Sequence, residues 1–222
     1  MHEEILFDGM TAVAEALSRW PALAAFYLAG GTALALHLGH RQSRDLDLFT
    51  RQPMAVLPPL PGMDEALGSY HRVEWELNTR EQISWRLDGV SVTLLAYPFA
   101  HRFPLHAWRG LSVADARDVA VQKAYTLGRR AQARDYLDLH AALTGGVLSL
   151  DDVLQWGPAT YGDAFSPRLF LQQLTYTRDV MDLDSALALL ATPRPFATIA
   201  RELAVQVQAW GRAHWNPPGA PR

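Results

Sequence analysis

The chain has 222 residues, 49% of them hydrophobic, with a formal net charge of −3 at pH 7. This length suits one sizeable core or two smaller lobes, and the composition is that of a globular protein. The absence of cysteine excludes a disulfide framework and any thiolate metal site. The slight acidic excess argues against extended coating of nucleic acid, which needs many Lys and Arg contacts to phosphate. One RNA end could still enter a cleft.

The first ten residues, MHEEILFDGM, carry acids where a signal peptide has a basic segment, and no long uncharged apolar run follows. We therefore expect a cytoplasmic protein. Residues 3–20 have apolar side chains spaced by three or four, which predicts one amphipathic helix ending near Pro21.

The stretch 26–49, FYLAGGTALALHLGHRQSRDLDLF, is the most informative part of the chain. It predicts a short apolar strand over residues 26–28, a Gly30-Gly31 turn, a helical segment over residues 32–38, a polar loop and a second strand over residues 45–49. Everything proposed below about function depends on this stretch.

The following segment, up to about residue 70, is rich in proline and predicts a loop with short helical turns at most. Three strands are expected next, over residues 71–77, 82–87 and 90–97, the last two joined at Asp88-Gly89, which favours a hairpin turn. A mixed sheet built on the two earlier strands is the natural assembly.

From Ser112 onward the pattern is helical. Ser112 or Asp115 is expected to cap a first helix, and a second is expected over residues 131–143, ended by Gly145-Gly146. Residues 150–214 are again helical, with breaks expected at Gly157-Pro158, Ser166-Pro167 and residues 193–195, and the tail 216–222 is expected to fray. The predicted fold class is α+β, with a small mixed sheet and helices in residues 1–110 and a helical lobe in residues 111–222.

Asp45 and Asp47 are the first candidates for chemistry. Alternate residues of a strand share a face, so both carboxylates project together while Leu46 and Leu48 point into the core. Two close carboxylates are costly unless a cation lies between them, and oxygen ligands favour Mg²⁺, or Mn²⁺ in its place. The alternative is a strand whose polar face simply meets water; the neighbouring Gly-Gly segment favours the metal.

Gly30 and Gly31 precede a helix, so backbone N–H groups and the helix N-terminus can approach a phosphate there. In the following loop, Arg41 and Ser43 are candidates for contact with a triphosphate, whereas we interpret His40 and Arg44 as ordinary surface residues.

Lys123, the only lysine, falls on a largely apolar helix face. It is expected to hold phosphates, to pair with Asp118 or to extend to solvent. The cluster Arg129, Arg130, Arg134, Asp135 and Asp138 fits an acceptor-facing site or a helix surface of ion pairs, and the sequence favours neither.

Taken in order, Gly30-Gly31, the spacer and Asp45-Leu46-Asp47-Leu48 resemble the polymerase-beta-type nucleotidyltransferase superfamily. The full string GGTALALHLGHRQSRDLDLF is similar to one family within it, the AbiEii/AbiGii-type toxins of toxin–antitoxin systems. The likeness extends to GVSVTLLAYPF, to D-x-x-x-x-K from Asp118 to Lys123, and to R-D-x-x-D from Arg134 to Asp138. It spans roughly residues 26–143.

The resemblance implies a polymerase-beta-type fold and a magnesium-dependent enzyme that transfers a nucleoside monophosphate from an NTP to a hydroxyl of RNA, such as tRNA, or of a protein. It also implies an antitoxin as partner. Asp45 and Asp47 would hold the metal, and Asp135 would act as base or orient the acceptor. The residues expected to bind the nucleotide are Gly30, Gly31, Thr32, Arg41, Ser43 and Lys123.

One departure bears on catalysis. Members of the superfamily often carry a third carboxylate on the next sheet strand, for which Thr93 is the natural place, and none of the residues there is acidic. In the two-metal scheme this acid shares the ion that activates the attacking hydroxyl. Two alternatives therefore stand beside the enzyme: a non-catalytic nucleotide- or partner-binding module on the same fold, and a nucleotidyltransferase acting on a small molecule such as an antibiotic.

Overall fold

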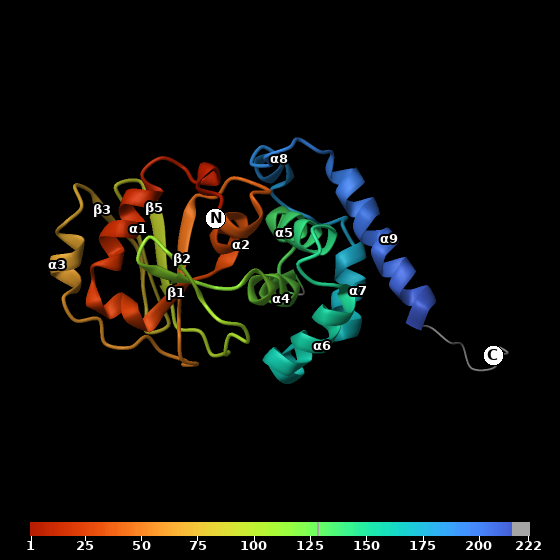
Figure 1. Ribbon diagram of the computed structural model, residues 1–222, viewed down its shortest axis with the longest axis horizontal. Helices are drawn as coiled ribbons and strands as arrows, with labels where there is room; N and C mark the ends of the chain where they lie inside the picture. Colours follow the sequence, from red (N-terminus) through yellow and green to blue (C-terminus); the bar gives the residue numbers. More distant parts are fainter. Residues whose placement is uncertain (128, 215–222) are drawn as a thin grey trace.

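A mixed sheet forms one end of the molecule and a group of helices forms the other (Figure 1). The computed structural model describes residues 1–127 and 129–214. Within these residues the sheet has seven strands in the order β3-β4-β5-β2-β1-β7-β6. The strands are β1 (Phe26–Leu28), β2 (Asp45–Thr50), β3 (Val73–Asn78), β4 (Gln82–Leu87), β5 (Val90–Leu95), β6 (His106–Trp108) and β7 (Leu111–Val113).

The centre of the sheet is formed by β1, β2 and β5. β1 is buried at all three positions and pairs antiparallel with β2, which in turn pairs parallel with β5. On β2 the side chains alternate as predicted: Leu46 and Leu48 are buried, while Asp45 and Asp47 are only partly covered. The register sets Asp47 beside Thr93 of β5. The predicted mixed sheet is thus confirmed, and Asp45 and Asp47 lie on one face of its central strand β2.

The helices are α1 (Met10–Ser18), α2 (Gly30–Leu38), α3 (Met63–Leu67), α4 (Ala116–Leu127), α5 (Ala133–Thr144), α6 (Leu150–Tyr161), α7 (Pro167–Thr175), α8 (Leu183–Leu187) and α9 (Phe196–His214), with short 3₁₀ turns at Glu3–Ile5, Pro21–Ala25 and Gly162–Ala164. Helices α1 and α3 lie at the sheet end, and the helices from α4 onward form the other end (Figure 1). Ser149 and Asp152 form a capping box that starts α6, and Ser166 with Pro167 starts α7.

Each end of the molecule has its own hydrophobic core. The first contains the strands, α1 and most of α2, and reaches Val119; the second begins at Ala120 and contains the later helices. Both residues belong to α4, so one helix is shared by the two cores. Figure 1 shows α2 and α4 between the sheet and the later helices α5 to α9. The division into two lobes at residue 110 stays a prediction.

The predicted N-terminal helix over residues 3–20 is wrong in extent. The chain forms a 3₁₀ turn at Glu3–Ile5, and a helix begins only at Met10, after Gly9 with φ of +85°. A φ in the left-handed region interrupts a helix, and glycine adopts it without steric cost. Apolar spacing alone did not reveal this break.

Ser112 does not cap a helix, because it lies in β7. A hairpin of β6 and β7, turning at Arg109-Gly110, occupies the region where the helical pattern was expected to begin. Asp115 does cap α4: its carboxylate accepts a hydrogen bond from the backbone N–H of Arg117, 3.0 Å away. The strands are only three residues long, too short for an alternation to be recognised.

The predicted break at Gly157-Pro158 is also wrong, since α6 continues to Tyr161 with Pro158 inside it. Pro158 has no N–H to donate to the carbonyl one turn earlier, and the helix nevertheless continues for three residues beyond it. Gly157 has a packing role instead, because a Cβ there would lie 2.6 Å from the ring of Phe165. The breaks at Ser166-Pro167 and before α9 are confirmed.

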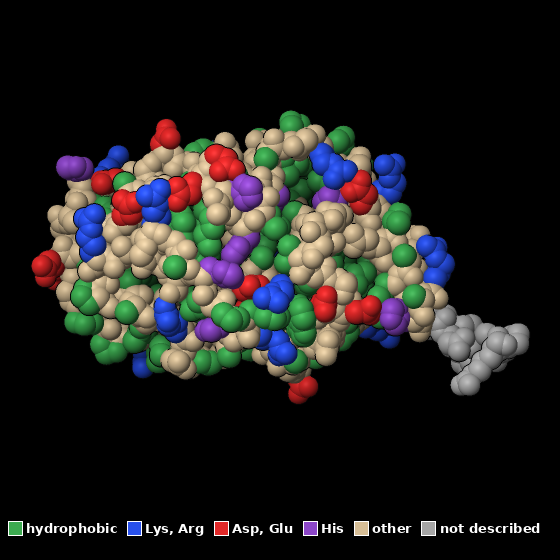
Figure 2. Space-filling model, viewed as in Figure 1, with side chains coloured by type: hydrophobic (Ala, Val, Ile, Leu, Met, Phe, Trp, Pro, Cys, Tyr) green, Lys and Arg blue, Asp and Glu red, His purple; other side chains and the backbone are tan. Residues whose placement is uncertain are grey.

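The expected fraying of residues 216–222 lies outside the described residues. Among the residues described, no helix combines the length and the apolar character needed to span a bilayer. Acidic and basic side chains alternate over the face drawn in Figure 2, and no single sign dominates it.

Leu46→Ala should lower the free energy of unfolding by about 2–5 kcal/mol, because the side chain of Leu46 is completely buried on the core face of β2 and the substitution leaves a cavity. Leu77→Ala on the edge strand β3, where the side chain is 41% exposed, should cost about 0.5 kcal/mol. Urea unfolding followed by circular dichroism measures both. Equal losses in the two variants would contradict the packing described for β2.

Candidate functional site

Asp45 and Asp47 project from the same face of β2. Burial and the negative charge of Asp45 both raise the pKa of Asp47, and cationic side chains across the cleft offset only part of this. Asp45 is more exposed, and the guanidinium of Arg134 lies 3.4 Å from its Oδ2. The two acids therefore form a strained pair whose mutual repulsion is incompletely neutralised by the protein itself.

Gly30 and Gly31 lie against these acids, in the first turn of α2 rather than in a separate turn before it. The backbone N–H of Ala29 donates to the carbonyl of Asp47 at 2.8 Å, which fixes the start of α2 beside β2. Gly30 has φ of +61°, and a Cβ there would lie 2.6 Å from Oδ2 of Asp47. A Cβ on Gly31 would overlap the guanidinium of Arg41. Both positions need glycine because charged side chains approach the backbone there.

Arg41 is buried beneath α2 and does not extend freely from a surface loop. Its Nε and Nη2 donate to the two oxygens of Asp138 at 2.6 and 3.0 Å, and His40 Nε2 donates to Oδ1 at 2.7 Å. Asp138 is completely buried, which by itself raises its pKa, but Arg41 and then Lys123 outweigh burial and hold that pKa well below its usual range. His40, expected on the surface, is thus part of this network.

Lys123 belongs to the same network. Its Nζ lies 2.8 Å from Asp135 Oδ1 and 2.7 Å from Asp138 Oδ2, so the lysine bridges two carboxylates of α5. The expected pairing with Asp118 does not occur, because Asp118 accepts the backbone N–H groups of Arg102 and Phe103 instead. Lys123 is buried because it is doubly paired.

Asp135 is completely buried and receives hydrogen bonds from both sides. Besides Lys123, the guanidinium of Arg130 donates to it, with Nε 2.9 Å from Oδ2. These contacts fit a residue that holds two cations in place; a general base needs an open path to the acceptor hydroxyl.

Two hydroxyls complete the floor. Thr32 Oγ1 and Ser43 Oγ are 2.7 Å apart, and Thr32 also donates to the carbonyl of Asp45. They connect the first turn of α2 to the start of β2.

These groups line one cleft of about 200 Å³, which we call the charged cleft. It is lined by three carboxylates, four cationic side chains and a polar remainder: Asp45, Asp47, Asp135, Arg41, Lys123, Arg130, Arg134, Gly31, Thr32, Ser43 and Gln132. Gly30 lines an adjoining cavity that shares Gly31, Asp47, Lys123 and Arg130 with the cleft. The predicted site residues, drawn from five elements and loops, are therefore brought together.

Sequence reasoning placed Arg130, Arg134 and Asp138 in an ambiguous cluster and did not consider Gln132. A spacing of three or four residues puts Asp135 and Asp138 on one face of α5, with Arg134 at its edge. That spacing was the available signal. The spacing does not reveal that this face of α5 points toward α2 and the loop that carries Arg41.

The donor set fits a hard divalent cation. Asp45 and Asp47 offer carboxylate oxygens on one side of a cleft open to the N-terminus of α2. Within the described ranges no group of three or more His, Cys, Asp or Glu side chains could hold a metal ion. A bound ion would therefore take its remaining ligands from phosphate oxygens and water, as Mg²⁺ does in many nucleotide sites.

Residues 12–84, which contain both glycines and both acids, match the family model described as "Nucleotidyl transferase AbiEii toxin, Type IV TA system". The AbiEii resemblance is confirmed over these residues. An uncharacterised protein of Aquifex aeolicus is 32% identical over 124 residues, a match that covers 51% of this chain and 55% of that protein. The match thus spans about half the length of this curated relative.

Solved structures show the fold. A crystal structure from H. pylori, provisionally described as a nucleotidyltransferase, has a TM-score of 0.60 and 17% identity, over 96% of this chain and 94% of that chain. The crystal structure of JHP933 from Helicobacter pylori has a TM-score of 0.56 and 17% identity, over 96% and 91% of the two chains. The chain therefore has the polymerase-beta-like nucleotidyltransferase fold.

Asp138→Asn should lower the free energy of unfolding at pH 7 by about 3–5 kcal/mol, because Arg41 and Lys123 would stay buried with one countercharge fewer. The folded pKa of Asp138 lies below its unfolded value of about 4. Its contribution is therefore complete above that value and declines as the pH falls toward the folded pKa. The difference between wild type and variant should narrow below about pH 4.

Urea unfolding at several pH values measures this difference. The exposed Asp163 supplies the matched control, and Asp163→Asn should change stability by about 0.5 kcal/mol at most. A pH-independent difference for Asp138→Asn would contradict the role of its charge.

Proposed function

We propose that this protein is a magnesium-dependent nucleotidyltransferase that moves a nucleoside monophosphate from an NTP to a hydroxyl group and releases pyrophosphate. One observation carries the proposal: Asp45 and Asp47 share a cleft with the glycine-rich start of α2 and with four cationic side chains. The AbiEii family match and the fold support a transferase of this class.

The triphosphate fits the charged cleft. The first turn of α2 offers backbone N–H groups near Gly31, and Thr32 and Ser43 add hydroxyls. Arg130 and Arg134 have partly exposed side chains, so they can reach phosphate oxygens without leaving the buried network. Arg41 and Lys123 lie deeper and contribute their charge from below.

The charge balance explains why a cation should accompany the nucleotide. The four cations Arg41, Lys123, Arg130 and Arg134 are matched by the four carboxylates Asp45, Asp47, Asp135 and Asp138. A triphosphate adds about four negative charges, which this balanced site does not neutralise. Mg²⁺, or Mn²⁺ in its place, would be held by Asp45 and Asp47 and would offset that negative charge.

In the proposed reaction the acceptor oxygen forms a bond to the α-phosphorus. The bond from that phosphorus to the oxygen shared with the β-phosphate breaks, pyrophosphate leaves, and the hydroxyl proton passes to solvent. Arg130 and Arg134 stabilise the charge on the departing phosphates. Asp135 fits a role in orienting Lys123 and Arg130, whose nitrogens donate hydrogen bonds to its oxygens.

The acceptor and the partner are proposed from likeness. The family description names a toxin of a toxin–antitoxin system, so we propose an RNA end such as tRNA, or a protein side chain, as the acceptor and an antitoxin as the partner. An antibiotic-like small molecule would use the same cleft and a different acceptor surface.

Thr93 favours a second candidate, a nucleotide-binding module without catalysis. It lies beside Asp47 in the register of β2 and β5, where a third carboxylate would project into the same space. Its Oγ1 contacts Ser84 at 3.2 Å and offers no negative charge. Such a module would bind the magnesium nucleotide and transfer nothing.

Incubation of the pure protein with Mg²⁺, total RNA and each α-labelled NTP tests transfer. Label should appear on RNA, and Asp45→Asn and Asp47→Asn should each reduce it by about 100-fold or more, because each removes a charged ligand of the metal. Asp64→Asn, an exposed acid on α3, should transfer normally.

The outcomes separate the candidates. Metal-dependent NTP binding without transfer to RNA, protein or small molecules would favour the binding module. Transfer as fast in both β2 variants as in wild type would refute the assignment of the metal site.

Asp47→Asn should raise the melting temperature of the metal-free protein by a few degrees. Burial and Asp45 raise the folded pKa of Asp47 above its unfolded value, so the ionised carboxylate costs stability at neutral pH and its cost falls as the pH is lowered. Mg²⁺ with pyrophosphate should then stabilise wild type but not the variant. Differential scanning fluorimetry measures both; a lower metal-free melting temperature for Asp47→Asn would contradict the strain.

A further inference from the structure

The cavity that adjoins the charged cleft has a different chemical character. It has a volume of about 330 Å³ and meets the cleft at Gly31, Asp47, Lys123 and Arg130. Away from this shared edge its walls are aromatic or aliphatic side chains and uncharged polar groups, among them Phe49, Tyr97, Tyr125, Gln82 and Gln122. We call it the side cavity. A group attached to phosphates in the charged cleft could extend into the side cavity. There it would contact apolar side chains and amides and, among the described residues, no charged one beyond the shared edge.

The wall on the helical side is rigid. The ring of Tyr125 stacks on that of Tyr161 at a centroid distance of 4.0 Å and an angle of 11°. The guanidinium carbon of Arg129 lies 4.2 Å from the centre of the Tyr125 ring. The hydroxyl of Tyr97 hydrogen-bonds that of Tyr161 at 2.9 Å. Rings held in this way cannot move aside for a larger occupant, so the side cavity keeps its shape.

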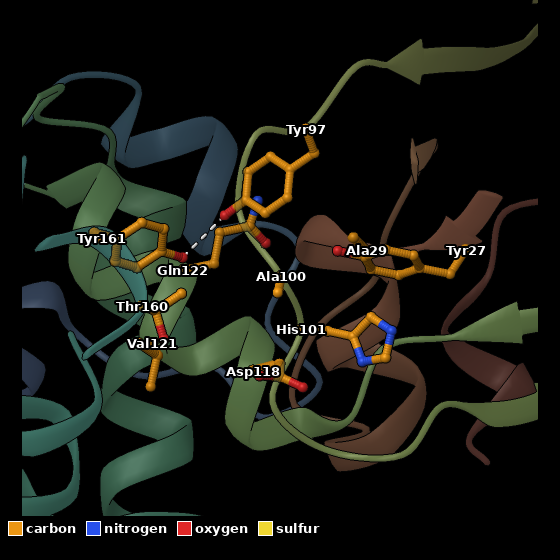
Figure 3. A pocket seen from close by; sticks show the side chains of 10 residues that line it. All are labelled: Tyr27, Ala29, Tyr97, Ala100, His101, Asp118, Val121, Gln122, Thr160 and Tyr161. Carbon is orange, nitrogen blue, oxygen red and sulfur yellow. Dashed lines mark hydrogen bonds between the residues drawn. The ribbon is translucent and has the colours of Figure 1, made fainter. Parts of the chain in front are cut away.

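Gln122, on α4, lines both the side cavity and a smaller neighbouring cavity. Figure 3 draws that neighbouring cavity and shows the Gln122 amide beside the Tyr97 hydroxyl, close to where Tyr97 meets Tyr161. The next residue of α4, Lys123, is fixed by two buried carboxylates, so the backbone that carries Gln122 is also fixed relative to the charged cleft. Gln122 is half-buried and lines the side cavity directly.

Gln82 contributes a second amide from the opposite wall, on β4. Its Nε2 donates to Ser84 Oγ at 3.0 Å, and Ser84 Oγ lies 3.2 Å from Thr93 Oγ1. This short chain of polar groups orients the amide. The side cavity therefore offers amides from both the sheet and the helical part.

We propose that the side cavity receives the nucleobase of the NTP and that Gln122, assisted by Gln82, determines which base is accepted. The inference rests on the function proposed above. Every base presents a planar apolar face and an edge with donors and acceptors, and an amide pairs with such an edge through one donor and one acceptor. The apolar walls suit any base equally, so discrimination falls to the amides.

The experiment compares the binding of four NTPs and of pyrophosphate, each with Mg²⁺, by isothermal titration calorimetry. Wild type should bind its best and worst NTP with dissociation constants at least about tenfold apart. In Gln122→Ala the four values should fall within about threefold of one another, and Gln82→Ala should give a smaller effect in the same direction. Gln122→Glu, which can only accept hydrogen bonds, should change the order of preference.

Two controls keep the result interpretable. Pyrophosphate affinity should change by less than about twofold in every variant, because the amides lie outside the charged cleft, and this also shows that the variants are folded. Gln172→Ala, an exposed glutamine of α7, should retain the wild-type ratios.

Equal binding of all four NTPs by wild type, or an unchanged ratio in Gln122→Ala, would overturn the base-selection proposal and leave the proposed function standing. Failure of wild type to bind both pyrophosphate and every NTP would overturn the two together.

Discussion

The carboxylate of Asp138 is removed from solvent, and four nitrogens reach it: His40 Nε2, Arg41 Nε and Nη2, and Lys123 Nζ. These nitrogens come from the loop after α2 and from α4, while the carboxylate belongs to α5. A buried ion of this kind is tolerated only when its partners are in place. One charge thereby fixes the relative positions of the three segments that form the floor and one wall of the charged cleft.

The same arrangement divides labour between buried and exposed charge. Asp138 and Asp135 satisfy the deep cations, so Arg130 and Arg134 remain partly exposed at the mouth of the cleft. Asp45 and Asp47, in contrast, keep part of their repulsion, as the raised pKa of Asp47 indicates. The buried ion pairs below the cleft therefore stabilise the fold, whereas the repulsion between Asp45 and Asp47 at the cleft costs stability. That distribution is expected where a site is prepared for a ligand absent from the free protein.

The sequence was sufficient for the features set by local periodicity. Alternation on β2 placed Asp45 and Asp47 on one face, and the glycine pair indicated a close approach to the backbone; the structure has both. The family resemblance supplied the fold. The sequence was insufficient to predict short elements such as the β6–β7 hairpin, because strands of three residues show too little alternation. The partners of Lys123 and Arg41 were also beyond it, because they are twelve and 97 residues distant in the chain and meet only through tertiary packing.

The position of α4 across both hydrophobic clusters has a consequence for how such a protein can diversify. The helix packs in the sheet core at Val119 and in the helical core from Ala120 onward. Gln122 and Lys123, which follow, line the side cavity. Changes in packing among the later helices would tilt α4. The side chains of Gln122 and Lys123 would then move relative to the two acids of β2. Changes in substrate preference could therefore accumulate in residues that never touch a substrate, while the β2 edge of the site stays untouched.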